Sequence, residues 1–295
     1  MKIGIDLGGM SAKVGICDGS EVVRSAKIET GRDITFEELI DALKVTLESV
    51  AAGEDYDFVG ISSCGFIDRK GGAIVYSNNI PWKNKPFASE VNKITGKPVG
   101  IANDAKCAAL AEAVFGAGKG YESVCMLTLG TGVGGAFVYE GKLTEGSVYR
   151  DVDCHFGHMT VEHEGRLCTC GRRGCLEAYA SATAVMNTYR EITGKSLTAK
   201  EIIDGARLGG KAENKAVDSL VEYLSDGVAN IVNAFRPELV IIGGGLAGGA
   251  DVFLDRVSVT VNERIFGGSF LPVKFATAKL GNDAGIIGAT LLESV

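Results

Sequence analysis

A strand–turn–strand unit occurs twice in the chain, and this repeat constrains the fold more than any other sequence feature. In each copy a short apolar strand runs into a glycine-rich turn, and a second strand then reaches a tight turn that ends in Gly19 or Gly141. Turns of the Asp-Gly type between apolar runs are a strong β-hairpin signal. Leu7, Gly8 and Gly19 of the first copy align with Leu129, Gly130 and Gly141 of the second. We therefore expect two related halves, each opening with a hairpin.

Helical segments follow each hairpin. Thr35 and Glu38 have the spacing of a capping box, and apolar residues then recur at helical period up to residue 50. Thr198 and Glu201 form a second such pair. Further helices are expected at 106–115, 176–193, 215–235 and 284–292, and strands at 57–62 and 239–242. Alternation of strands and helices predicts an α/β fold.

The length of 295 residues favours two domains over a single core. Residues 116–120 are glycine-rich and are expected to form a linker or hinge. We expect a smaller α/β domain at 1–117, completed by a C-terminal helix at 284–295. The remainder, 118–283, is expected to form a larger α/β domain.

Three glycine turns, at 8–9, 130–135 and 243–245, each follow an expected strand. Backbone N–H groups in such turns bind phosphate, because no side chain competes for the space. The spacing of Gly130, Gly132 and Gly135 also matches a dinucleotide fingerprint. That fingerprint needs a helix directly after the turn, whereas a strand is expected here. One such turn alone is more often a plain connection, but three favour a nucleoside triphosphate site.

Three of the eight cysteines, Cys168, Cys170 and Cys175, lie close together, and all three histidines lie upstream of them. Thiolate and imidazole are the ligands of tetrahedral structural zinc. Disulfides or unrelated thiols are the alternatives, but disulfide scaffolds are typical of small secreted chains. His158 and His163 both remain candidates for a fourth ligand. The cysteines at 17, 64, 107 and 125 lie in apolar contexts and are expected to be core residues.

The net charge of −7 argues against a nucleic-acid partner, which needs a basic face. No apolar run approaches the roughly 18 residues of a membrane span, and the N-terminus lacks the features of a signal peptide. We therefore expect a cytoplasmic protein with neither a nucleic acid nor a membrane as partner.

Several motifs together resemble one known family, over the whole length of the chain. The residues that carry the resemblance are Asp6-Leu-Gly-Gly9, Asn103-Asp104, Leu129-Gly-Thr-Gly-Val-Gly-Gly135, Gly157-His158, Cys168-x-Cys170-Gly-x-x-Gly-Cys175-Leu-Glu177 and Ile242-Gly-Gly-Gly245. This set is similar to the ROK family of sugar kinases and repressors. The resemblance implies an actin-like ATPase fold, duplicated from ribonuclease H-like domains that flank a cleft, and a homodimer. Repressors of the family carry an N-terminal helix-turn-helix domain, whereas this sequence starts at its first strand, so we expect a kinase.

The resemblance also implies roles for single residues. Asp104 would be the catalytic base that accepts the proton of a sugar hydroxyl, and Asp6 would orient Mg²⁺. Sugar-binding residues would be Gly65, Asn79, Asn103, Asp104, His155, His158 and Glu177. ATP would be bound by Asp6, Gly8, Gly9, Lys13, Thr131, Gly132, Gly244 and Gly245. A structural Zn²⁺ would be held by His158, Cys168, Cys170 and Cys175.

The sequence departs from the family pattern at three positions: His155 stands where a glutamate is common, Lys106 replaces an asparagine, and Met10 replaces a threonine. A histidine can donate a hydrogen bond where a carboxylate only accepts. Lys106 could simply be solvated at a helix start, and Ser11 could supply the missing hydroxyl. The first hypothesis is an ATP-dependent hexose kinase acting at the 6-hydroxyl, on glucose or on mannose, fructose or an N-acetylhexosamine. The second is a catalytically weak sugar-binding protein.

Overall fold

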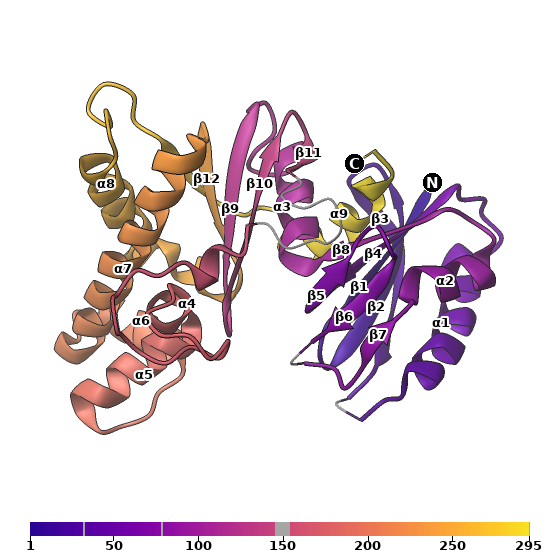
Figure 1. The fold of residues 1–295 in the computed structure, drawn as a ribbon, viewed down its shortest axis with the longest axis horizontal. Coiled ribbons are helices and arrows are strands. Elements are labelled where there is room, and N and C mark those ends of the chain that lie inside the picture. The colour runs from indigo at the N-terminus through magenta and orange to yellow at the C-terminus, as the bar shows by residue number, and fades with distance from the viewer. Residues whose placement is uncertain (32, 78, 145–153, 295) are drawn as a thin grey trace. The chain divides into compact units, whose positions relative to one another are not determined.

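The structure is a computed structural model that describes residues 1–31, 33–77, 79–144 and 154–294 (Figure 1). The chain separates into two compact units. The first comprises Met1–Gly120, the described part of Gly141–Asp153, and Leu280–Val295; the second comprises Tyr121–Glu140 and Cys154–Lys279. The expected division into domains at 1–117 with 284–295, and 118–283, stays a prediction.

The first unit is built on a five-stranded sheet with the order β3-β2-β1-β4-β8. The antiparallel hairpin strands come first, and β4 and β8 then add in parallel to β1. These strands are β1 Lys2–Leu7, β2 Ser11–Asp18, β3 Glu21–Glu29, β4 Phe58–Ser63 and β8 Val99–Asn103. A small antiparallel sheet consists of β5 Phe66–Asp68, β6 Ala73–Tyr76 and β7 Lys83–Lys85. The helices are α1 Phe36–Ala51, α2 Phe87–Thr95, α3 Asp104–Val114, α9 Ala284–Thr290 and the short 3₁₀ turns η3 Gly281–Asp283 and η4 Leu291–Ser294.

The two faces of this sheet differ in composition. On β1, Ile3, Ile5 and Leu7 are buried in one apolar cluster with the inner residues of α1 and α2. On the opposite face, a row of glycines crosses four neighbouring strands: Gly15, Gly4, Gly60 and Gly100. Alternation along each strand therefore gives one face large apolar side chains and leaves the other bare along this row of glycines.

The glycine row lets the C-terminal helix α9 lie directly on the sheet. A Cβ atom at Gly4 would lie 2.2 Å from the Ile286 carbonyl oxygen, and one at Gly60 would lie 1.8 Å from that of Ala289. On the far side of α9, a Cβ atom at Gly288 would lie 1.8 Å from the carbonyl oxygen of Cys107 on α3. These glycines therefore serve the close packing of α9 between a sheet and a helix.

The second unit repeats the arrangement with the strand order β10-β9-β12-β13. Again an antiparallel hairpin is followed by strands parallel to its first member. The strands are β9 Ser123–Leu129, β10 Val133–Tyr139, β12 Leu239–Gly243 and β13 Lys274–Thr277, and the residues of the short strand β11, Lys142–Leu143, belong to the first unit. The helices are η1 Phe156–His158, α4 Glu177–Ala180, α5 Ala182–Thr193, α6 Ala199–Arg207, α7 Lys211–Phe235, η2 Gly245–Val252 and α8 Leu254–Arg264. The duplication expected from the repeat is confirmed.

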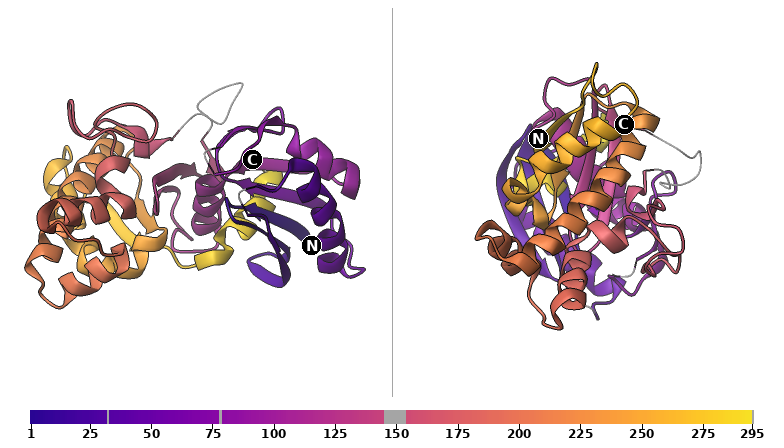
Figure 2. Two further views of the ribbon diagram at one scale, coloured as in Figure 1. Left: turned by 90° about the horizontal axis from the view of Figure 1, so that it is seen from below. Right: turned by 90° about the vertical axis from the view of Figure 1, so that its left-hand side faces the viewer.

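The core of the second unit lies between its sheet and the long helix α7. Leu127 and Ile242 of the sheet share one buried cluster with Leu220, Leu224 and Val228 of α7. Figure 2 (right) shows α7 and its neighbouring helices lying over the strands of this unit. The spacing of the apolar residues on α7 is that of a helix with one buried face.

Some helix boundaries differ from the sequence expectations. The expected helix 176–193 is broken at Ser181, whose hydroxyl accepts the backbone N–H of Ala184 and so begins a new helix, α5. The helix expected at 215–235 begins earlier, at Lys211. The capping boxes at Thr35 and Thr198 are confirmed.

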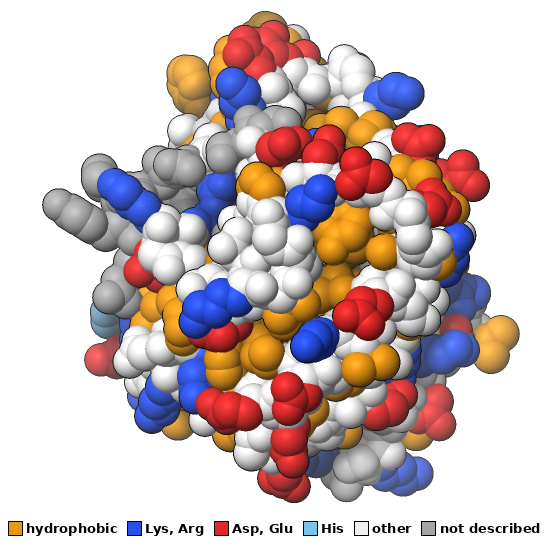
Figure 3. Space-filling model, turned by 90° about the vertical axis from the view of Figure 1, so that its right-hand side faces the viewer, with side chains coloured by type: hydrophobic (Ala, Val, Ile, Leu, Met, Phe, Trp, Pro, Cys, Tyr) orange, Lys and Arg blue, Asp and Glu red, His pale blue; other side chains and the backbone are white. Residues whose placement is uncertain are grey.

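On the face drawn in Figure 3, acidic and basic side chains are mixed with apolar ones. Within the residues that the structure describes, no helix is long and apolar enough to cross a bilayer.

Candidate functional site

Asp6 lies near the end of the central strand β1, and its neighbours come from three other elements. Its direct partners in the sheet are Lys13 on β2 and Ser62 on β4. The Ser62 hydroxyl donates to Asp6 Oδ1 at 2.6 Å, and Lys13 also forms an ion pair with Asp283. A Cβ atom at Gly285 of α9 would lie 2.5 Å from the Asp6 carboxyl carbon. Burial raises the pKa of Asp6, while the Ser62 hydrogen bond and the Lys13 charge oppose that rise.

The first glycine turn follows Asp6 and is closed by a hydrogen bond from Gly8 N–H to the Ser11 carbonyl at 2.9 Å. Gly9 packs on Asn79, because a Cβ atom at Gly9 would lie 2.7 Å from that of Asn79. Met10, the next residue of the turn, is 59% exposed. The turn and Asn79 are thus brought together within the first unit.

Asp104 is the first residue of α3, and Asn103 caps the same helix. The Asn103 side chain accepts from Ala105 N–H at 3.0 Å and donates to the Gly65 carbonyl, also at 3.0 Å. Gly65 has φ of 104°, a conformation that other residues rarely adopt. Asn103 therefore joins the start of α3 to the loop after β4 and fixes the position of Asp104.

Asp104 is exposed to solvent as a residue, and the protein around its carboxylate desolvates that group. Burial of this group and the nearby charge of Asp6 raise the pKa of Asp104 to about 6, against the lowering effect of Ala105 N–H and Asn103. A carboxylate with a pKa close to neutrality is suited to accept and release a proton. Lys106, two residues further on, is only 2% exposed. The expectation that it is simply solvated is therefore wrong.

In the second unit, the glycine turn between β9 and β10 is fastened by the corner between α4 and α5. Ala182 N–H donates to the Gly130 carbonyl, and the Thr183 hydroxyl donates to the Thr131 carbonyl, both at 2.8 Å. A Cβ atom at Gly132 would lie 2.2 Å from Glu177 Oε2. The shape of this turn thus depends on residues about fifty positions later in the chain.

Glu177 joins this turn to the cysteine loop. Its Oε2 accepts from Val133 N–H at 3.1 Å, and its Oε1 accepts from the Thr169 hydroxyl at 2.8 Å. The Cys168 thiol also lies 3.5 Å from Oε1. A carboxylate has about four acceptor positions, so these contacts leave capacity for a ligand.

Four side chains converge in the cysteine loop with the geometry of a metal site. The ligand atoms of His158, Cys168, Cys170 and Cys175 all lie within 4.8 Å of one another. Cys168 Sγ is 3.7 Å from His158 Nδ1, and Cys170 Sγ is 3.7 Å from Cys175 Sγ. Tetrahedral zinc with Zn–S bonds of about 2.3 Å separates its sulfur ligands by roughly 3.8 Å. The donor set therefore fits zinc, and His163 is not in the group.

Protein contacts also hold the cysteine loop from outside. Arg166 N–H donates to the Tyr179 hydroxyl at 2.7 Å, and the Arg166 guanidinium donates to the Thr188 hydroxyl at 3.0 Å. His155 lies at the other end of the loop, with its ring centroid 6.4 Å from that of His158. His155 is therefore next to one candidate metal ligand and is exposed to solvent.

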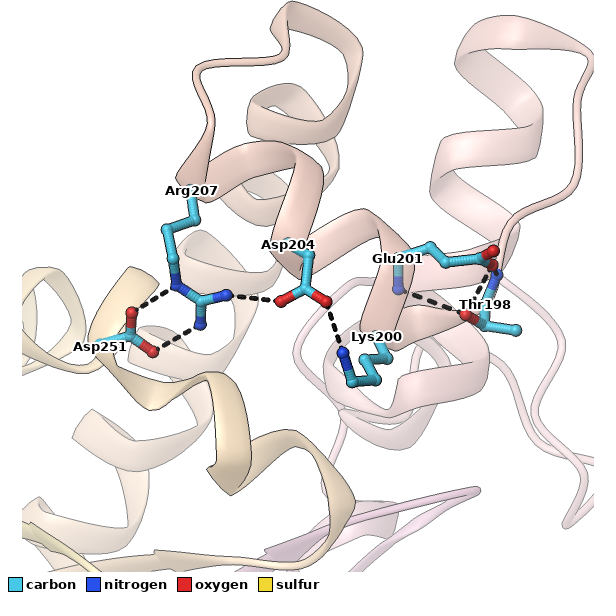
Figure 4. Close-up of polar contacts among 6 residues, drawn as sticks. All are labelled: Thr198, Lys200, Glu201, Asp204, Arg207 and Asp251. Carbon is cyan, nitrogen blue, oxygen red and sulfur yellow. Dashed lines mark hydrogen bonds and ion pairs between the residues drawn. The ribbon is translucent and has the colours of Figure 1, made fainter.

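The third glycine turn follows β12. Gly244 has φ of 79°, and a Cβ atom there would lie 2.6 Å from the Leu129 carbonyl oxygen, so only glycine fits. The turn continues into η2, which is tied to α6 by the hydrogen bonds of Arg207 to Asp251 at 2.7 and 2.8 Å (Figure 4). Gly244 and Gly245 thus begin a segment that is anchored at its other end.

A sequence profile of the ROK family matches residues 2–294. The chain belongs to the ROK family. It is 38% identical to the glucokinase of Thermotoga maritima over 308 aligned positions, which cover 97% of this chain and 95% of that protein. The ROK family glucokinase of Streptomyces griseus, solved with glucose and AMPPNP, superposes with a TM-score of 0.83 at 30% identity, covering 100% of this chain and 99% of that one. The ROK hexokinase of Thermus thermophilus gives a TM-score of 0.86 at 30% identity, with coverage of 98% and 96%.

The site residues expected from the ROK motifs fall into two sets, one in each unit. The first unit holds Asp6, Gly8, Gly9, Lys13, Gly65, Asn79, Asn103 and Asp104, and the second holds Thr131, Gly132, His155, His158, Cys168, Cys170, Cys175, Glu177, Gly244 and Gly245. Sequence reasoning missed Ser62 and Thr183, which touch these residues. Neither lies in a recognisable motif, because each acts through a partner distant in the sequence.

Proposed function

We propose that this chain, an ATP-dependent sugar kinase, phosphorylates a hexose at its 6-hydroxyl with Asp104 as the general base. The observation that carries the proposal is the placement of Asp104 at the start of α3, where Asn103 is fixed on Gly65 and the pKa of Asp104 is raised to about 6. A base with such a pKa is ionised at neutral pH and still binds a proton well enough to take one from an alcohol.

In this proposal the sugar 6-oxygen attacks the γ-phosphorus while its proton passes to Asp104. A bond forms from the sugar oxygen to phosphorus, the bond from phosphorus to the bridging oxygen of ADP breaks, and ADP leaves. Such transfers depend mainly on alignment and on stabilising charge around the phosphoryl oxygens. Mg²⁺, which Asp6 would orient, supplies that charge stabilisation when it is bound with ATP.

The glycine turns would hold the nucleotide. The turn at Gly8 and Gly9, with Lys13, and the turn at Thr131 and Gly132 would place backbone N–H groups and one ammonium group around the phosphates. Gly244 and Gly245 would border the adenosine, because their backbone can approach a ligand closely.

The cysteine loop would shape the sugar side. Zinc bound by His158 and the three cysteines would hold the loop rigid, and His158, Glu177, Asn79 and Asn103 would contact sugar hydroxyls. We also propose a homodimer, which light scattering on the purified protein tests directly.

The identity of the sugar depends on His155 in this proposal. A neutral imidazole can donate as well as accept, so it would read a hydroxyl differently from the glutamate common in the family. Glucose, mannose, fructose and N-acetylhexosamines are the candidate substrates. We expect His155→Glu to raise kcat/KM for glucose relative to the other sugars. An unchanged sugar profile would show that His155 does not set specificity.

An assay of ADP release across this panel of sugars tests the activity itself. Turnover with at least one hexose, and a product that carries phosphate on the 6-oxygen by NMR, is expected. No turnover with any sugar, combined with a rise in unfolding temperature when a sugar is added, would instead support the weak sugar-binding protein. Phosphate on another oxygen would retain the kinase and overturn the 6-hydroxyl.

A further inference from the structure

Ser62 is an unusual residue for its place in the fold. It lies on β4, in which every residue is buried, and its own side chain is 0% exposed. A hydroxyl buried without a partner costs a few kcal/mol, so such a group needs a hydrogen bond. The partner of Ser62 is the carboxylate of Asp6.

The pairing of the strands makes this contact specific. Asp6 and Ser62 face each other across the parallel pair β1–β4, and directly paired residues project to the same face of a sheet. The distance of 2.6 Å from Ser62 Oγ to Asp6 Oδ1 is that of a hydrogen bond from a hydroxyl to an ionised carboxylate. Such bonds are stronger than those between neutral groups and define the direction of the acceptor.

Two other elements limit the remaining freedom of Asp6. Lys13 is its direct partner on β2, and the backbone of α9 at Gly285 lies against the carboxylate. This approach is so close that no side chain would fit between α9 and Asp6 at position 285. Because Ser62 holds Oδ1, the plane of the carboxylate is fixed, and so is the direction in which Oδ2 points.

We propose that Ser62 is a positioning residue for phosphoryl transfer. Its hydroxyl fixes the Asp6 carboxylate in the orientation that binds the complex of Mg²⁺ with ATP. The proposal rests on the function proposed above, in which Asp6 orients Mg²⁺. Its consequence is that Ser62 contributes to the binding of ATP with the metal and not to the binding of ATP alone.

Three substitutions separate this role from a merely structural one. Ser62→Ala removes the hydroxyl, and Ser62→Thr retains it. Ser63→Ala is the matched control, because Ser63 is the next residue of β4, is equally buried, and donates instead to the Cys64 carbonyl at 3.2 Å. Affinity for ATP is measured by calorimetry with and without Mg²⁺ in the absence of sugar, and kcat and KM are measured alongside.

We expect Ser62→Ala to weaken the binding of ATP with Mg²⁺ by about tenfold, the scale of one hydrogen bond to a charged group. Binding of ATP without the metal should stay close to wild type. Ser62→Thr should restore most of the loss, and Ser63→Ala should show none. If Ser62→Ala does not fold, Ser62→Cys keeps the volume with a weaker donor and should show a loss in the same direction.

Equal weakening with and without Mg²⁺, or the same effect in Ser63→Ala, would overturn the positioning role. So would a wild-type protein that binds ATP equally with and without the metal. If the wild type shows the expected metal dependence but turns over no sugar, the proposed function fails and the role of Ser62 in nucleotide binding stands.

Discussion

The carboxylate of Glu177 accepts the backbone N–H of Val133 at 3.1 Å, and through this bond the cysteine loop contacts the glycine turn of the second unit. The other oxygen of Glu177 accepts from the Thr169 hydroxyl, one residue after Cys168. The loop that would hold zinc and the turn that would hold phosphate therefore share one side chain. We infer that a change in the shape of either alters the other, because both are hydrogen-bonded to the same carboxylate.

A substitution at Thr183 tests whether the hydrogen bond that holds the turn at Thr131 contributes to ATP binding. Thr183→Val keeps the shape of the side chain and removes the hydrogen bond to the Thr131 carbonyl, so the glycine turn should become less well ordered. Losing one neutral hydrogen bond of about 1 kcal/mol predicts a rise in KM for ATP of roughly fivefold, with KM for the sugar little changed. Steady-state kinetics with each substrate varied in turn measure both values.

The control for Thr183→Val is Thr193→Val on the same helix, since the Thr193 hydroxyl donates to the Tyr189 carbonyl within α5. It should leave KM for ATP unchanged. Equal effects of the two substitutions would mean that the helix, and not the contact with the turn, is responsible.

The metal site predicts one zinc ion per chain in freshly purified protein. Cys170→Ser removes a ligand from the group of four and should lower the zinc content sharply. The unfolding temperature should fall by about 5–10 °C, because metal binding to a folded site stabilises that site. Elemental analysis and thermal denaturation are the measurements.

A buried cysteine outside the group is the control for the metal prediction. Cys17→Ala on β2 should lower stability by creating a small cavity and yet retain zinc. Protein purified without chelators that contains no zinc would contradict the metal assignment, whatever its stability.

The pH dependence follows from the raised pKa of Asp104. Only the ionised carboxylate can accept a proton, so kcat/KM should fall as the pH drops through about 6, well above the 3.8 of an ordinary aspartate. Asp104→Asn should lose about a hundredfold or more in kcat while still binding sugar. An acid limb near pH 4, or turnover that survives the substitution, would contradict the role of Asp104 as the base.

The unfolding free energy should change with pH in the opposite direction to kcat/KM. Because the folded state binds the Asp104 proton more tightly than the unfolded chain does, the stability of the fold falls as the pH rises from 3.8 to about 6 and then levels off. Asp104→Asn should therefore be more stable than the wild type at pH 8, and this advantage should shrink as the pH falls from 6 to 4. Chemical denaturation at a series of pH values measures the difference.

Local signals in the sequence were sufficient to predict the hairpins, both capping boxes and the convergence of the cysteine loop, because neighbours in the chain form each of these. The break at Ser181 was missed, since a serine within a helical period can either continue the helix or cap a new one. Ser62 was missed because its partner Asp6 lies on another strand. Such roles depend on which strands pair, and the hydrophobic pattern alone does not specify that pairing.

The glycine row across the first sheet was missed for a similar reason. Glycine within a strand usually weakens the strand. Gly60 is needed because α9, from the far end of the chain, packs directly against it. A Cβ atom at Gly60 would lie 1.8 Å from the Ala289 carbonyl oxygen, which belongs to the helix backbone and cannot rotate away. Gly60→Ala should therefore displace α9 and cost about 3 kcal/mol or more of unfolding free energy.

Gly248→Ala is the control, because a Cβ atom there meets nothing within 4 Å, and its stability should stay within about 1 kcal/mol of wild type. Urea denaturation compares the two, and a Gly60→Ala protein as stable as the Gly248→Ala protein would show that α9 does not need the bare surface of the sheet.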